Sequence, residues 1–166
     1  TENIYIKIDN DSTFFSNGTE QYPFKQWWHY VQYSLLKTQG STQQIYIDGT
    51  FDGIVIRDCD FSLRIAGWGN GCTMEYIILD NTDSVLLDSI TFTPNNHDAI
   101  MATHCQYLYA RNITVNGTGD RLIGATGTVI EFENLTVSGT FGAMVSTDSQ
   151  IRFSGTTNFT NANIIN

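Results

Sequence analysis

The feature that most constrains the fold is a repeat in the second half of the chain. The segment NITV at 112–115 returns as NLTV at 134–137, an offset of 22 residues. A repeat of this length is typical of a solenoid, in which each unit buries its apolar face only by stacking on its neighbours. The same interval aligns apolar residues in two columns, the first Ile90, Ile113 and Leu135 and the second Phe92, Val115, Val137 and Phe159.

Each repeat contains two further short alternating segments. One contributes the pairs Val85/Leu87, Leu108/Ala110, Ile130/Phe132 and Ile151/Phe153, and the other the column Ile77, Ile100, Leu122 and Met144. Three strands in a rung of about 22 residues predict an all-β parallel β-helix of about five rungs. The final NIIN begins another strand, so we expect either a partner on that end or a native chain that continues.

Residues 1–50 lack the period, and we expect them to form an N-terminal cap ahead of rungs over 51–166. The segment 4–8 alternates like a strand, and the segment 22–40 predicts an amphipathic helix. We expect this helix to cover the exposed end of the first rung, with its two tryptophans packing rather than binding a ligand. Its predicted apolar face is Phe24, Trp27, Trp28, Val31, Leu35 and Leu36.

A column of small polar residues precedes the third strand of each rung: Ser89, Asn112, Asn134 and Thr156. Stacked Asn side chains hydrogen-bond along a solenoid and to turn backbone. Asn112, Asn134 and Asn158 also match the N-glycosylation pattern. We favour an inward-pointing ladder over glycan attachment. One residue earlier, Asp88, Arg111 and Glu133 alternate in charge, so neighbouring rungs should attract.

Composition excludes several classes of function. The chain has 17 acidic and 8 basic residues in 166, a formal net charge of -9, which disfavours nucleic acid as a partner. No apolar stretch is long enough to span a bilayer, so we expect no membrane insertion.

Three widely spaced cysteines predict buried free thiols, with a Cys59–Cys72 bridge as the alternative. No nucleotide, metal or nucleophile motif is present, and we expect no cofactor and no metal.

The N-terminal third carries a resemblance. A strand, a polar loop, Pro-Phe-x-x-Trp at 23–27 and IYIDGTF at 45–51 lead into stacked rungs. This order resembles the entry to right-handed β-helix domains of bacteriophage tail spikes and tail fibres, and the rungs resemble the wider pectin-lyase-like family. The resemblance implies a right-handed coil, a homotrimer, and contact with bacterial surface polysaccharide, which some members cleave.

Alternation predicts an apolar column on the outer face of the first strand of each rung. If Ile77, Ile100 and Leu122 point inward, their C-terminal neighbours point outward. A contiguous apolar stripe on the outside of the rungs indicates a surface that another part of the assembled protein covers. We favour a subunit interface over a loop of the same chain as that cover. The predicted interface residues are Ile78, Met101, Ile123 and Val145.

An acidic column, Glu75, Asp98 and Asp120, precedes the first strand of successive rungs. Stacked carboxylates about 5–5.5 Å apart would suit a retaining glycosidase, and they could also bind Ca²⁺. Asp is a common turn residue, so we favour solvated turn positions and keep these three only as catalytic candidates.

Three aromatic residues are candidates for binding a glycan. Tyr107 and Tyr109 flank inward-pointing Leu108 and should face outward, and Trp68 lies in a glycine-rich loop. Exposed aromatic rings suit stacking on sugars or a subunit interface.

These patterns lead to one functional hypothesis with two alternatives. We expect a bacteriophage tail domain, folded in the bacterial cytoplasm, that supports the virion tail and binds a glycan or receptor at the bacterial surface. The first alternative is a polysaccharide hydrolase or lyase of the tail-spike type, so enzymatic activity stays open. The second is a bacterial surface adhesin.

Overall fold

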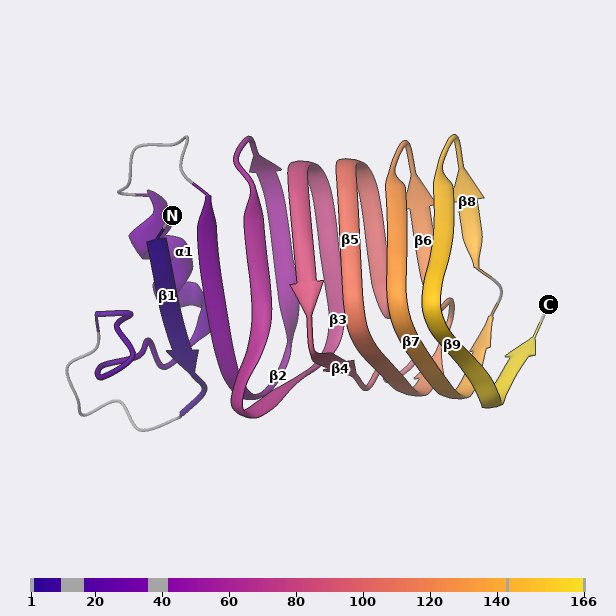
Figure 1. Ribbon diagram of the computed structural model, residues 1–166, viewed down its shortest axis with the longest axis horizontal. Helices are drawn as coiled ribbons and strands as arrows, with labels where there is room; N and C mark the ends of the chain where they lie inside the picture. The colour runs from indigo at the N-terminus through magenta and orange to yellow at the C-terminus, as the bar shows by residue number, and fades with distance from the viewer. Residues whose placement is uncertain (1, 10–16, 36–41, 143, 166) are drawn as a thin grey trace.

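The polypeptide coils into stacked turns of parallel strands along one long axis (Figure 1). The computed structural model describes residues 2–9, 17–35, 42–142 and 144–165. Its single nine-stranded sheet winds through about five turns, which confirms the predicted parallel β-helix and is consistent with a right-handed coil. The strands are β1 (Glu2–Lys7), β2 (Gln43–Cys59), β3 (Leu63–Asp88), β4 (Ile90–Phe92), β5 (Ile100–Gly119), β6 (Ile123–Thr126), β7 (Val129–Gly142), β8 (Val145–Thr147) and β9 (Gln150–Ile165).

Most of the predicted columns are present. The register pairs Val85 with Leu108, Leu108 with Ile130, and Ile130 with Ile151. Every backbone group of an inner rung can therefore bond to the rungs on both sides, while like side chains stack in a continuous core. The largest fully buried side chains include Phe92, Phe132, Phe141, Ile77 and Leu87.

The long strands bend at corners where one residue adopts a left-handed conformation. One corner column holds Ser89 (φ 56°), Asn112 (φ 53°), Asn134 (φ 60°) and Gly155 (φ 64°). Asn and Gly tolerate positive φ better than other residues, which explains why Asn-aliphatic-Thr-Val recurs in the sequence. A second corner column holds Asp58, Asn81, His104, Gly127 and Asp148, all at φ between 46° and 58°.

The ladder side chains form bonds along this corner, but they do not point inward as predicted. Asn134 Nδ2 donates to Asn112 Oδ1 at 3.3 Å, and Asn112 Nδ2 donates to Asp88 Oδ1 at 3.2 Å. Asn112 and Asn134 are nevertheless exposed, because a left-handed corner turns its side chain away from the core. Thr156 lies one residue beyond the corner, and its backbone N–H donates to Asn134 Oδ1 at 3.0 Å.

The N-terminal segment lies at one end of the stack (Figure 1). β1 pairs in parallel with the start of β2, and Phe24 bridges to Ile6. β2 runs across the predicted domain boundary at residue 50 without a break. The helix α1 spans Trp27–Leu35 and so begins later than predicted, and residues 36–40 lie outside the described residues.

The apolar face of α1 differs from the prediction. Trp27 packs against the core, and buried Tyr30 donates its hydroxyl to Gln43 Oε1 at 2.5 Å. Trp28 is 55% exposed and Val31 is 37% exposed, so their predicted placement in the core is wrong. Phe24 is buried, but it lies in the segment before α1, where it bridges to Ile6, and not on the helix.

The three cysteines, Cys59, Cys72 and Cys105, are buried and free, as predicted. Burial raises the pKa of each thiol, and it raises the pKa of Cys72 to about 12. A buried thiol with a raised pKa is a poor nucleophile, so these residues serve packing rather than chemistry.

Candidate binding groove

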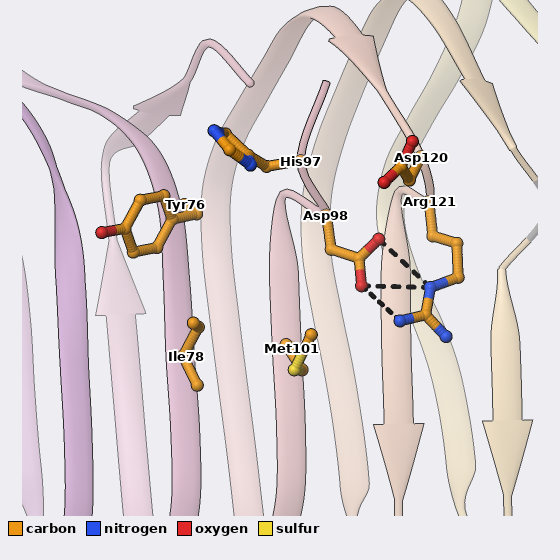
Figure 2. A pocket seen from close by; sticks show the side chains of 7 residues that line it. All are labelled: Tyr76, Ile78, His97, Asp98, Met101, Asp120 and Arg121. Atoms are coloured by element: carbon orange, nitrogen blue, oxygen red, sulfur yellow. Dashed lines mark hydrogen bonds and ion pairs between the residues drawn. The ribbon is translucent and has the colours of Figure 1, made fainter. Parts of the chain in front are cut away.

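A groove of about 650 Å³ lies on the outer face of the middle rungs (Figure 2). Two of its residues come from β3, one from β5, and the others from the segments that lead into β5 and β6. The groove is therefore built across three successive rungs, whose spacing is set by the ladder. Its lining residues are Tyr76, Ile78, His97, Asp98, Met101, Asp120 and Arg121.

The floor of the groove is apolar because one outward column carries Ile78 and Met101 side by side. The next position in this column is Gly124, which pairs with Met101. A Cβ atom at Gly124 would lie 3.3 Å from Arg121 Cζ and 3.5 Å from Asp98 Oδ2. The absence of a side chain at Gly124 thus leaves room for an ion pair over the strand.

Asp98 and Arg121 form that ion pair. Arg121 Nε donates to both carboxylate oxygens at 3.0–3.1 Å, and Nη2 donates to Oδ2 at 2.5 Å. The Asp98 side chain is only 8% exposed. The hydrogen bond from Arg121 to Asp98 raises the pKa of the guanidinium, and the charge of Asp120 adds to this effect. Both groups are therefore held in fixed positions on one wall.

The other wall is aromatic. Tyr76 and His97 meet edge to face, with ring centroids 5.9 Å apart and an interplanar angle of 70°. His97 Nε2 lies 3.7 Å from Glu75 Oε2, which brings a carboxylate to the rim. The groove therefore combines an apolar floor, an aromatic ring and polar groups in fixed positions, and this combination is typical of small-molecule binding sites.

The predicted acidic column is not assembled as expected. Ile77 pairs with Ile100 and Ile100 with Ile123, so Arg121, not Asp120, lies in register with Asp98. Asp120 is one residue farther from the strand and exposed. Of the three catalytic candidates, Glu75 is beside His97, Asp98 is neutralised by Arg121, and Asp120 lines the groove.

The predicted outward placement of Ile123 is wrong. Ile123 is fully buried and pairs with Ile100, while Gly124 takes the outer position. Leu122 and Ile123 are both apolar, so the pattern could not separate a 22-residue rung from the 23-residue rung observed. Ile78 and Met101 are half-buried on the outer face, and the backbone of Val145 pairs with Gly124. Val55, 40% exposed, extends the column by one rung.

The aromatic candidates lie on another outer face in two separate places. The rings of Tyr107 and Tyr109 are nearly parallel, 6.5 Å apart at 12°, and each hydroxyl donates to a glutamate of the next rung, Glu131 and Glu133 respectively. Those hydrogen bonds, together with burial and the nearby carboxylate charges, raise the pKa of both hydroxyls. Trp68 instead meets Tyr5 edge to face at 5.1 Å.

Sequence reasoning missed the groove itself. The sequence patterns did not single out Tyr76, His97 or Arg121. The available signal was the sequence DRLIG at 120–124, which contains a glycine and has one residue more between Asp120 and the buried Ile123 than lies between Asp98 and Ile100. Only the register shows that Arg121, and not Asp120, lies opposite the Asp98 carboxylate.

Comparisons of the chain with protein-family models, with curated proteins and with solved structures find no significant match. Within the described residues, no group of three or more His, Cys, Asp or Glu side chains could hold a metal ion. No helix in the described part of the chain is long and apolar enough to cross a membrane. Any functional assignment therefore depends on the fold, the groove and the sequence resemblance.

Proposed function

We propose that this β-helix binds a bacterial surface glycan through the groove, as an attachment module of a bacteriophage tail spike or tail fibre. The groove over Ile78 and Met101 is the observation that supports binding. The resemblance of the N-terminal entry segment to tail-spike β-helices supports the phage assignment.

The chemistry of the groove suits a sugar. A sugar ring has an apolar face that packs on an aromatic ring such as Tyr76, and hydroxyls that need fixed hydrogen-bonding partners. The ion pair of Asp98 with Arg121 supplies such partners without moving, because each side chain holds the other. Rungs paired on both sides make the wall rigid, so binding would order few side chains.

Binding is favoured over cleavage by the state of the carboxylates. A general acid or nucleophile needs a carboxylate free to exchange a proton or attack. Asp98 is bound through both oxygens by Arg121, and Asp120 is out of register with it. This arrangement supports a holding role for the acidic residues.

Replacing Tyr76 by Ala should weaken glycan binding about tenfold, because the aromatic wall is lost. The measurement is affinity for a panel of purified bacterial polysaccharides, with the exposed Tyr22→Ala as the control. If Tyr107→Ala abolished binding while Tyr76→Ala did not, the site would be the tyrosine pair and not the groove.

The apolar column also favours a second candidate, a side-by-side homotrimer. Val55 continues the column beyond the groove and is 40% exposed. Sedimentation equilibrium of the wild type and Val55→Asp tests this: a trimer that the charge dissociates supports the interface. A monomeric wild type would leave the column open to the glycan. A trimer unchanged by Val55→Asp would place the interface elsewhere.

A further inference from the structure

The charges of the groove are unequal. Asp98 and Asp120 line it together with one guanidinium, that of Arg121, and the imidazole of His97. Arg121 donates hydrogen bonds from Nε and Nη2 to the Asp98 carboxylate. Asp120 is exposed and has no hydrogen bond or ion pair among the described residues, although its charge helps to raise the pKa of Arg121. Among the described lining residues, the groove thus has two carboxylates and one guanidinium, which pairs with Asp98.

The surroundings reinforce this imbalance. The carboxylate of Glu75 lies at the rim, 3.7 Å from His97 Nε2, and the whole chain has a formal net charge of -9. The ring of Tyr76 offers a π-face, which attracts cations as well as apolar groups. A carboxylate or phosphate on a ligand would be repelled by Asp120 and would compete with Asp98 for Arg121.

We infer that the groove selects a glycan whose repeating unit carries a protonated amino group, with Asp120 as the carboxylate that pairs with it. This inference rests on the proposed glycan-binding function and specifies the class of sugar. Asp98 and Arg121 then act as the rigid wall that positions the sugar ring, while Asp120 forms an ion pair with the protonated amino group of the sugar.

The test compares two sugars that differ in this one charge, a glucosamine tetramer and the same tetramer after N-acetylation, at pH 6. The wild type should bind the amine form about threefold to fivefold more tightly, the range for a partly exposed ion pair. Asp120→Asn should remove this preference, because the affinity for the amine form should fall to the level of the acetylated form.

The matched control is Asp148→Asn. It makes the same change in net charge at an exposed corner, where the left-handed backbone (φ 46°) accepts Asn. This variant should keep the preference. Equal affinity of the wild type for both sugars would overturn the inference, as would a preference that survives Asp120→Asn or disappears in Asp148→Asn.

The two proposals fail in different ways. If the wild type binds a neutral or acidic polysaccharide in a Tyr76-dependent manner but neither tetramer, the inference is wrong and the proposed function stands. If no glycan of any charge binds, the proposed function itself fails, and the inference fails with it.

Discussion

Phe132→Ala should lower the free energy of unfolding by about 3–5 kcal/mol, whereas Phe153→Ala should cost about 1–2 kcal/mol. The two residues occupy one core column on adjacent rungs, with parallel rings 5.7 Å apart. Phe132 is 1% exposed and Phe153 is 42% exposed, because nothing among the described residues stacks on the last rung. The difference is measured by urea denaturation of both variants and the wild type.

This pair of variants also reports on the end of the stack. The chemical change is the same at both positions, so only the surroundings of the ring differ. If both substitutions cost the same, Phe153 must be covered in solution by something that the described residues do not supply. Concentration-dependent stability would then point to another copy of the chain as the cover.

Asp88→Asn should destabilise the protein by about 2–3 kcal/mol at pH 7. The Asp88 carboxylate is 11% exposed and accepts hydrogen bonds from Arg64 at 3.1 Å, Arg111 at 2.8 Å and Ser89 at 2.9 Å. The predicted attraction between Asp88 and Arg111 is thus confirmed, with Arg64 as an unpredicted second cation. Removing the charge leaves two arginines without their shared anion.

The effect should depend on pH in one direction. Burial by itself would raise the pKa of Asp88, but the bonds from Arg111, Ser89 and Asn112 outweigh it and hold the pKa below its ordinary value. A group with a depressed folded-state pKa stabilises fully above its unfolded pKa, about 3.9, and loses that contribution as pH falls through the folded value. The gap between wild type and Asp88→Asn should therefore be constant from pH 7 to 5 and shrink below about pH 4.

Asp80→Asn is the matched control for this prediction. Asp80 also faces an arginine of a neighbouring rung, but Arg57 Nε is 3.9 Å away and the side chains are 65% and 47% exposed. Such a pair contributes about 0–1 kcal/mol. A loss in Asp80→Asn as large as in Asp88→Asn would show that burial and multiple donors are not what makes Asp88 important.

The periodic positions were predictable because the core dictates them. Leu108 and Ile130 must be apolar, since each is enclosed by the rungs on either side. The sequence predicted that the corner residues are polar and recur in each rung. It did not predict that Asn112 and Asn134 adopt positive φ or that their side chains are exposed. Hydropathy records burial and does not record backbone handedness.

The groove was hidden for a different reason. Its position depends on a one-residue difference in rung length around Asp120, and a shift of one residue in a strand exchanges its inner and outer faces. With Leu122 and Ile123 both apolar, two registers satisfied the pattern equally well. The burial of both residues and the contact of Arg121 with Asp98 select one of them.

The sequence by itself determined the parallel β-helix, the columns of its core, the helix ahead of the rungs and the free buried thiols, because these follow from which residues must avoid water at a fixed period. The tertiary structure alone decided the register of the rung at Ile123, the side of α1 that packs, and the meeting of Tyr76, Asp98 and Arg121 in one groove. Those features depend on which atoms of different rungs come into contact, and a linear pattern does not specify such contacts.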